Sequence, residues 1–254
     1  MDVLLAVAAY TWKQHLRHRV YLGLLIFGLV LFGGVLVVSP LAVAERLRLL
    51  LDLGLAGIEA VALLAMVFLT VGLVIEELES RTLSLILAHP VPRSVYVLGR
   101  YAGTLAAVAS GMLAMSAAHV LLLLAYGWHF SAYYPLALLA MLGKIALTGA
   151  LALLLSLASS SAAAAMVFTA FLWVLGHFSP ELGYLGRKSG SWAAGALIWA
   201  VREAVPDLGV FNVRDFIGGL MPTASWYAWT ALYCAAYTGV CLLASCMLMS
   251  RKEL

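Results

Sequence analysis

Two charged side chains lie within otherwise apolar stretches of this sequence, and they are its first candidates for chemistry. Lys144 separates two uncharged runs, Tyr101–Gly143 and Ile145–Pro180, and Glu59 immediately precedes another, Ala60–Ile75. A charge at membrane depth is costly and commonly marks a functional position. Lys144 and Glu59 are therefore expected to pair or to line an outward cavity. The alternative is that each side chain extends to the membrane surface.

Soft metal ligands share one helical face in the third apolar run. Met112, Met115 and His119 are spaced i, i+3 and i+7, which places them on one side of a helix. Thioether and imidazole groups bind soft transition metals, so these residues are the metal candidates of the chain. A methionine stripe in a helical membrane protein is more commonly side-chain packing, and no metal site is predicted.

Motifs for the common enzyme reactions are absent from the sequence. It contains no GxxxxGK[ST] loop for ATP phosphates, no HExxH zinc site and no GxSxG nucleophile elbow. The chain is therefore expected not to be an enzyme and to bind no cofactor of its own. The net charge of +3 says little about partners, and no nucleic-acid partner is predicted.

The composition indicates that lipid is the main solvent of this chain. Hydrophobic residues make up 65% and charged residues 11% of its 254 positions, whereas about a quarter of a soluble domain is charged. A membrane-spanning helix needs about 20 apolar residues. We therefore expect an all-α membrane protein that forms one domain over residues 1–254 and crosses the membrane six times. The expected spans are Val20–Ala44, about Gly54–Ile75, one beginning at Tyr101, one crossing Lys144 to about Ala158, one ending near His177, and about Trp229–Met249.

Three segments outside the expected spans have distinct characters. Residues 1–19 have apolar side chains on one helical face and basic ones off it, which predicts a helix lying in the membrane surface; a frayed start to the first span is the alternative. Residues 76–100 form an inner loop. Residues 180–225 form an outer segment, in which 190–206 is expected to be a short helix that rests on the outer surface or dips in and returns. The distribution of basic residues favours both termini in the cytoplasm.

The densest charge cluster of the chain is the stretch EELESRTLSLILAHPVPRSVYVLGR, from Glu76 to Arg100. Its glutamates are expected to carry the second span out into the cytoplasm. Thr82–Ala88 predicts two turns of helix with exposed apolar side chains, which Pro90 and Pro92 then end. A short, partly apolar helix flanked by charge is suited to docking on a soluble protein. An ordinary interfacial loop is the alternative.

This stretch resembles the loop between the second and third spans of ABC transporter permeases of the type 2 export class. There, a glutamate-rich helix end precedes RT or GT, a leucine-rich coupling helix, P-[VI]-[SP]-R, and then GK or GR. The matching residues here are Glu77, Glu79, Arg81, Thr82, Leu83, Leu87, Pro90, Val91, Arg93, Gly99 and Arg100. The order of the expected helices agrees over essentially the whole chain. In form the chain is most similar to small permeases, such as the membrane subunit that serves copper maturation of nitrous oxide reductase.

The resemblance implies a transmembrane subunit that couples ATP hydrolysis to export or to force transmission across a bacterial or archaeal plasma (inner) membrane. A separate cytoplasmic ABC ATPase would bind ATP and Mg²⁺. The permease would be a homodimer in the lipid membrane, with an outer-side accessory protein as a further partner. The implied ATPase-coupling residues are Glu77, Glu79, Arg81, Thr82, Leu83, Ile86, Leu87, Pro90 and Arg93. The alternative function is a non-transport membrane scaffold that anchors a soluble cytoplasmic protein.

Overall fold

The computed structural model describes residues 3–38, 46–79, 92–188, 190–213 and 222–251, and all regular structure in these ranges is helical. The predicted all-α class is therefore confirmed for this part of the chain. The elements are α1 (Val3–Leu16), α2 (Arg19–Val38), α3 (Arg46–Glu79), α5 (Arg93–Ala125), α6 (Tyr133–Ala158), α7 (Ala162–His177), α8 (Ser179–Lys188), α9 (Trp192–Ala204), the 3₁₀ turn η2 (Gly209–Phe211) and α10 (Ala224–Arg251).

Four helices, α3, α5, α6 and α10, are long and apolar enough to cross a membrane. Two further pairs, α1 with α2 and α7 with α8, meet the same criterion only when their members are taken together. Their junctions bend by 58° and 68°, respectively. The chain therefore has the helices of a multi-pass membrane protein with four to six spans, a range that includes the predicted six without fixing that number.

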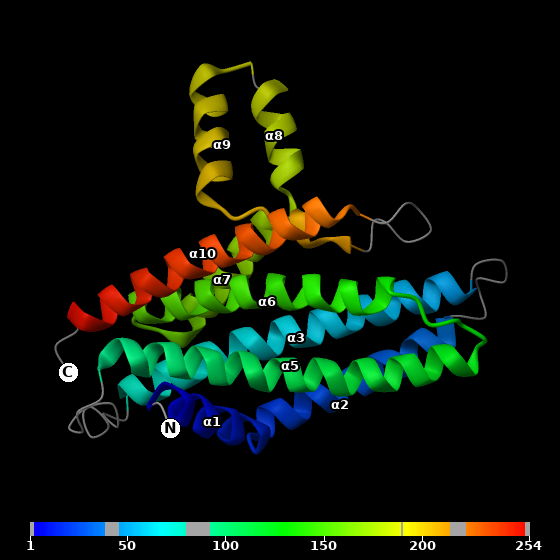
Figure 1. Cartoon of the computed structure of the whole chain (residues 1–254). Helices are drawn as coiled ribbons and strands as arrows, with labels where there is room; N and C mark the ends of the chain where they lie inside the picture. The colour runs from blue at the N-terminus through cyan, green and yellow to red at the C-terminus, as the bar shows by residue number, and fades with distance from the viewer. Residues whose placement is uncertain (1–2, 39–45, 80–91, 189, 214–221, 252–254) are drawn as a thin grey trace.

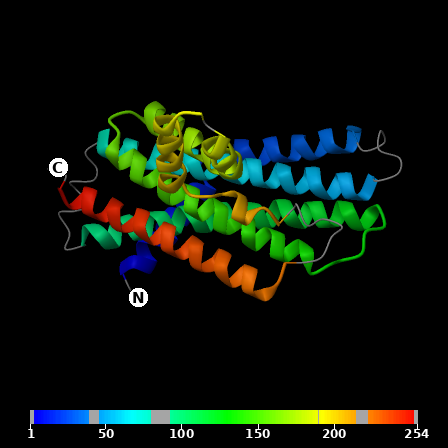
Figure 2. The same ribbon diagram turned by 90° about the horizontal axis from the view of Figure 1, so that it is seen from above.

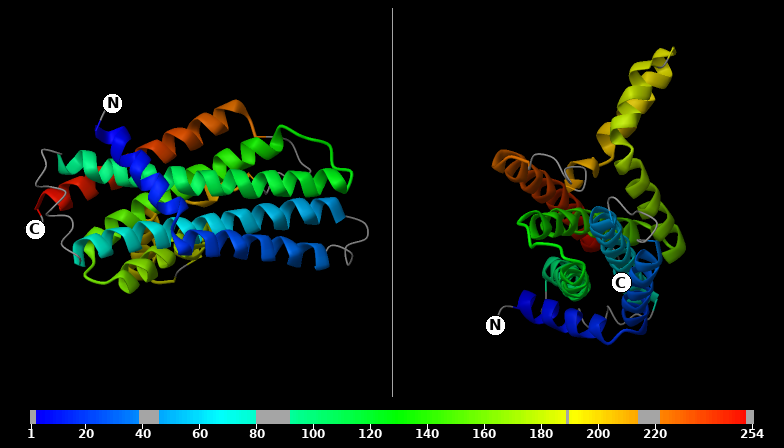
Figure 3. Two further views of the ribbon diagram at one scale, coloured as in Figure 1. Left: turned by 90° about the horizontal axis from the view of Figure 1, so that it is seen from below. Right: turned by 90° about the vertical axis from the view of Figure 1, so that its right-hand side faces the viewer.

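The long helices run side by side around α3, which contacts α2, α5, α6 and α7 (Figures 1 and 3). Large side chains of α3, such as Leu55 and Met66, are fully buried. Gly149 of α6 lies directly against Met66, so a side chain there would collide with the methionine. Small residues opposite large ones allow close packing, which matters because lipid provides no hydrophobic drive between helices.

The helix ends differ from the predicted ends where charged residues continue a helix. α3 begins at Arg46 rather than near Gly54, so Arg46 and Arg48 belong to its first turn and not to a loop. The Arg46 guanidinium lies over the ring of Tyr126, 4.5 Å from its centre, in the turn that follows α5. Basic side chains can extend from a helix end towards the membrane surface, so charge in the sequence does not mark where the helix stops.

Two helices follow α7 where the sequence predicted one. α8 and α9 pack against each other as a hairpin that projects away from the bundle (Figures 1 and 3). The predicted helix within residues 190–206 is α9, which has no buried residue and exposes 88% of Trp192. α8 was missed because Glu181, Arg187 and Lys188 give it the composition of a loop.

The chain returns from this hairpin to the bundle before the last helix. Val205, Leu208 and Phe211 are buried, and the Leu208 amide donates a hydrogen bond to the Gly176 carbonyl at 3.0 Å. α10 then runs obliquely over α6 and also contacts α5 (Figure 2). Residues 205–213 therefore lie against the bundle before the last helix begins.

Candidate functional site

The predicted docking loop itself lies outside the described residues, but both helices that carry it are described. Arg81, Thr82, Leu83, Ile86, Leu87 and Pro90 fall in the undescribed range 80–91, and the side chain of Glu79 is also not described. α3 ends immediately before this range, and α5 begins shortly after it. The candidate site that the structure describes is therefore the base of the loop.

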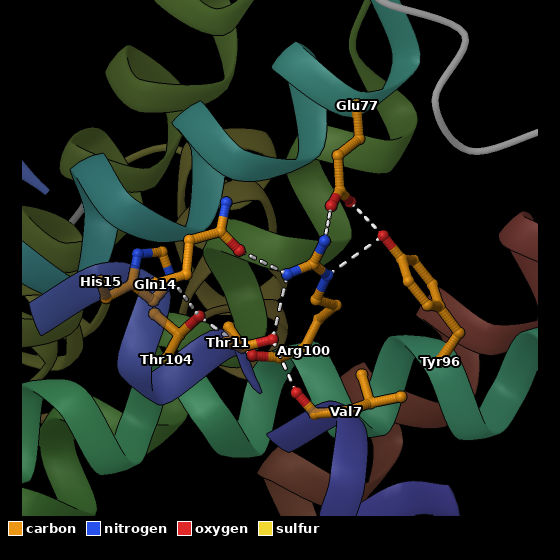
Figure 4. Close-up of polar contacts among 8 residues, drawn as sticks. All are labelled: Val7, Thr11, Gln14, His15, Glu77, Tyr96, Arg100 and Thr104. Carbon is orange, nitrogen blue, oxygen red and sulfur yellow. Dashed lines mark hydrogen bonds and ion pairs between the residues drawn. The ribbon is translucent and has the colours of Figure 1, made fainter. Parts of the chain in front are cut away.

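A buried polar cluster joins α1, α3 and α5 at this base (Figure 4). Arg100 of α5 stands at its centre, 6% exposed, and forms an ion pair with Glu77 of α3. The Tyr96 hydroxyl donates a hydrogen bond to the same carboxylate. We call this group the loop-base cluster, and its members are Thr11, Gln14, His15, Glu77, Tyr96, Arg100 and Thr104.

The guanidinium of Arg100 also reaches α1. Its Nη1 donates to Thr11 Oγ1 at 3.1 Å and to Gln14 Oε1 at 2.8 Å, and its Nε donates to the Tyr96 hydroxyl at 3.1 Å. A guanidinium presents five N–H donors in fixed directions, so one side chain can connect three helices. These contacts are shielded from water, which makes their electrostatic attraction stronger.

The two threonine hydroxyls of the cluster each donate to a backbone carbonyl of their own helix and accept from a neighbouring side chain. Thr104 Oγ1 donates to the Arg100 carbonyl at 2.9 Å and lies 3.0 Å from His15 Nε2. A threonine hydroxyl has a single proton, so it accepts from His15, which places the histidine proton on Nε2. Thr11 likewise donates to the Val7 carbonyl at 2.9 Å and accepts from Arg100.

Two glycines on α5 form the seat on which α1 packs. A Cβ at Gly99 would lie 2.8 Å from Val7, and one at Gly103 would collide with the Ala8 carbonyl and with Thr11. The two helices therefore approach at backbone distance, which is what a GxxxG pair permits. This close approach brings Thr11, Gln14 and His15 within reach of α5.

The burial of Glu77 corrects the expectation that the glutamates at this helix end all stand in water. Glu76 is exposed, as expected, but Glu77 is 9% exposed. A buried carboxylate requires a partner, and Arg100 provides it from 23 residues further along the chain. α5 runs beside α3 and so brings the two residues together. No local pattern in the sequence predicts this pairing.

Arg93, the second basic residue implied in coupling, contacts the end of the last helix. Its Nη1 donates to the carbonyls of Met249 at 3.0 Å and Ser250 at 3.3 Å. The final carbonyls of a helix have no partner within it and carry the negative end of its dipole. The Arg93 guanidinium bonds carbonyls at the C-terminal end of α10. The start of α5, which follows the loop, is therefore attached to the last helix.

Lys144 and Glu59 form a buried ion pair between α6 and α3. Lys144 Nζ lies 2.5 Å from Glu59 Oε1, and the two residues are 2% and 5% exposed. The predicted pairing is therefore observed, and the alternative that each side chain extends to the membrane surface is wrong. The pair ties the two helices together chemically; a role in transport stays a prediction.

His119 has protein partners at both ring nitrogens. Nδ1 lies 3.0 Å from the Tyr134 hydroxyl and Nε2 lies 3.2 Å from the Leu50 carbonyl, while Met112 and Met115 are buried nearby on the same helix. No group of three or more His, Cys, Asp or Glu residues in the described ranges is arranged to hold a metal ion. A metal at His119 would have to displace one of these hydrogen bonds.

No protein-family model matches the chain, and no curated protein matches its sequence. Function is therefore inferred from the residues and their geometry.

Proposed function

We propose that this chain is the transmembrane subunit of an ABC transporter of the type 2 export class, driven by a separate cytoplasmic ATPase. The observation that carries the proposal is the loop-base cluster. It ties α3, α5 and α1 together at the point where α3 enters and α5 leaves the loop that resembles a coupling loop. A force on that loop therefore acts on three helices rather than on one.

The proposed mechanism is mechanical. The partner ATPase binds ATP and Mg²⁺, and its closure displaces the loop docked on its surface. Glu77 and Arg100 make α3 and α5 move together, because separating them would leave two buried charges unpaired. Arg100 passes the displacement to α1 through Thr11 and Gln14. Arg93 passes it to the end of α10. Rigid elements linked in this way carry a displacement between distant sites.

The α8–α9 hairpin projects from the side of the bundle and would give the proposed complex a further contact surface (Figure 1). Tyr184, Trp192 and Trp199 are each more than half exposed on it, and large exposed aromatic side chains commonly mark contact surfaces. We assign this hairpin as a contact surface for an accessory protein. The rest of the proposal, a homodimer in a bacterial or archaeal plasma membrane, follows from the family resemblance, and the cytoplasmic location of both termini follows from the distribution of basic residues.

The direct test is purification of the tagged chain from its native membranes, followed by mass spectrometry of the associated proteins. We expect an ATPase subunit with a P-loop to copurify with the unmodified chain and to be lost from the variant Leu83→Asp/Leu87→Asp. Ser84→Asp is the matched control, because it adds a charge to the same loop without removing an apolar side chain. Retention of the ATPase by the double variant would contradict the docking assignment.

The scaffold alternative predicts a different outcome in reconstituted vesicles. A scaffold would retain a cytoplasmic partner through the same loop, but that partner would show no ATP hydrolysis that depends on the membrane subunit. An ABC transporter requires hydrolysis by the partner and loss of its regulation when Glu77 is replaced by Gln. Comparing ATP hydrolysis of the partner alone, with the unmodified chain and with Glu77→Gln separates the two functions.

A further inference from the structure

A cavity of about 240 Å³ lies between the C-terminal end of α1, the last turns of α3, and α7. It adjoins the loop-base cluster, because Gln14 and His15 belong to both. Leu73 of α3 and Met166 of α7 lie on its apolar side. Among the described residues that line it, Glu76 is the one that carries a carboxylate. The cavity is therefore amphipathic.

Gly72 gives the cavity its depth. It lines the cavity, and in the described chain no atom outside its own helix lies within 4 Å of a Cβ built on it. Glycine inside a helix is unfavourable by roughly 1 kcal/mol relative to alanine, and it is suited to places where another group approaches the backbone closely. Gly149 is used in this way, since it lies against Met66. At Gly72 the space is open to a ligand.

An exposed row of residues on α3 leads into the cavity. Its members are spaced four residues apart, and they are the exposed Ala60, Leu64 and Phe68, the half-buried Gly72 and the exposed Glu76. Four other helices contact α3, and this row is a strip that they leave uncovered. From Leu64 to Glu76 the row measures about 18 Å at 1.5 Å per residue, slightly more than half of a hydrocarbon core about 30 Å thick. A lipid chain can therefore follow the row while its headgroup reaches the cavity.

The polar groups of the cavity are accessible and of two kinds. Glu76 is exposed in the last turn of α3, and no described residue forms an ion pair with it. Its carboxylate can therefore accept hydrogen bonds from a cation. Gln14 is half-buried, and its Oε1 accepts from Arg100, so its amide nitrogen is turned away from Arg100 and remains a donor (Figure 4). One cavity thus offers an acceptor for an ammonium group and a donor for a phosphate oxygen.

We propose that this cavity binds the headgroup of one phosphatidylethanolamine molecule of the surrounding membrane. Its primary ammonium donates to the Glu76 carboxylate, and a phosphate oxygen accepts from the Gln14 amide. One acyl chain lies along Leu64 and Phe68. Hydrogen bonds between charged groups are stronger than those between neutral groups. Phosphatidylcholine has the same phosphate and chains, but its quaternary ammonium has no N–H and cannot make the bond to Glu76.

A helix of a second copy fits this row less well than a lipid. An α-helix with its side chains is about 10 Å across, and two packed helices interlock over several neighbouring rows. The exposed row of α3 is one side chain wide at Phe68, because Val67 and Leu69 on either side of it are buried. A single acyl chain can follow so narrow a strip.

The test is native mass spectrometry of the full chain released from nanodiscs that contain phosphatidylethanolamine and phosphatidylcholine in equal amounts. We expect the unmodified chain to retain phosphatidylethanolamine over phosphatidylcholine about tenfold. Glu76→Gln should abolish this preference, because it removes the negative charge that the ammonium binds. Asp52→Asn is the matched control, since it neutralises another exposed carboxylate of α3 outside the cavity, and it should keep the preference.

A second variant fills the cavity instead of changing its charge. Gly72→Leu should lower retention of phosphatidylethanolamine to the level of phosphatidylcholine. Gly57→Leu is its matched control, because it adds the same side chain to α3 at another open position outside the cavity. An unchanged thermal unfolding midpoint of Gly72→Leu shows that loss of lipid is not loss of folding, and Glu76→Gln tests the site without adding volume.

Two results would overturn the proposal. One is equal retention of both lipids by the unmodified chain, or a preference that is unchanged in Glu76→Gln, which would mean that Glu76 does not recognise an ammonium group. The other is efficient cross-linking between two copies through Leu64→Cys, with the native cysteines replaced by alanine, which would mean that a second copy covers the row. The site requires only that the chain spans a membrane, so neither result bears on the copurification of an ATPase.

Discussion

The single side chain of Arg100 joins three helices, α1, α3 and α5, a role that usually needs several side chains. Its charge neutralises Glu77, and its remaining N–H groups bond Tyr96, Thr11 and Gln14. A buried ion pair adds little net stability compared with apolar packing, but its loss on one side is costly. The geometry of the fork, and not the charge alone, is what holds α1 in place.

Replacing Arg100 by Lys is therefore expected to loosen α1 while it preserves the charge. A lysine ammonium can remain near Glu77 but cannot also reach both Thr11 and Gln14. The measurement is hydrogen–deuterium exchange, in which residues 3–16 should exchange faster in Arg100→Lys than in the unmodified chain. Arg93→Lys is the control, since Arg93 donates hydrogen bonds to carbonyls at the end of α10. Equal protection of α1 in Arg100→Lys and the unmodified chain would show that the hydrogen bonds to Arg100 do not hold it.

The ion pair between Lys144 and Glu59 predicts that a variant lacking one charge is less stable than a variant lacking both. Lys144→Met leaves a buried carboxylate without its partner and should lower the free energy of unfolding by roughly 3–5 kcal/mol. The double variant Glu59→Leu/Lys144→Met removes both charges and should recover most of that loss. Unfolding in detergent, followed by tryptophan fluorescence, measures both. If the double variant is stable but does not support transport, the pair has a role beyond stability; a double variant as unstable as the single one would argue against a coupled pair.

Among the elements of the bundle, α1 packs mainly on a single neighbour, α5. It lies against α5 on the seat formed by Gly99 and Gly103. Its buried side is polar, with Thr11 and His15 facing the bundle, while Leu5 and Tyr10 are more than half exposed. An amphipathic helix that presents its polar side to protein and its apolar side outwards is consistent with a location at the membrane surface.

A substitution in this seat should separate the effect of helix packing on thermal stability from the effect of helix propensity. Gly103→Ala places a methyl group against the backbone of α1 and is expected to lower the thermal unfolding midpoint. Gly57→Ala is the matched control in α3, because nothing lies within 4 Å of a Cβ built there. Alanine favours a helix over glycine by roughly 1 kcal/mol, so this control should be unchanged or slightly more stable. A stabilising effect of Gly103→Ala would contradict the close approach of α1.

The sequence contained enough to predict the all-helical class and most of the long helices, but not α8 and not which helices are neighbours. Uncharged runs mark the spans because an unpaired charge along a span is costly, and α3 and α6 each carry a charge that is paired with the other. The GxxxG spacing of Gly99 and Gly103 is typical of close helix contact. That spacing does not indicate that α1 is the neighbouring helix. Gln14, Tyr96 and Thr104 were missed for a related reason. Single polar residues in a helix acquire a role only when the fold brings a buried arginine to them.

For the whole molecule, the main asymmetry is between the two ends of the bundle. The start of α1, the end of α10, the end of α3 and the start of α5 lie towards one end, and the turn from α5 to α6 lies at the other (Figure 1). The proposed coupling role requires the first end to face the cytoplasm, where ATP is available. The orientation favoured by the basic residues agrees with this requirement.

Labelling of single cysteines with a membrane-impermeant maleimide tests this orientation. In a background without native cysteines, His129→Cys should react in intact cells, because His129 is exposed in the turn after α5. Ser250→Cys, exposed at the opposite end, should react only after the membrane is permeabilised. The reverse pattern would place the loop of residues 80–91 outside the cell and would exclude docking of a cytoplasmic ATPase there.

The seat of α1 also has a consequence for how the protein is made. α1 is synthesised before α5, and Arg100 and Thr104, which bond Thr11 and His15, follow 89 residues later. At about 5–20 residues per second, α1 waits on the order of 5–20 seconds after synthesis before its binding surface exists. During that time the membrane surface is the one place where its exposed apolar side chains can be accommodated. α1 can therefore be fixed only after α2, α3 and the start of α5 have been synthesised, and its docking on α5 reports that this part of the bundle is in place.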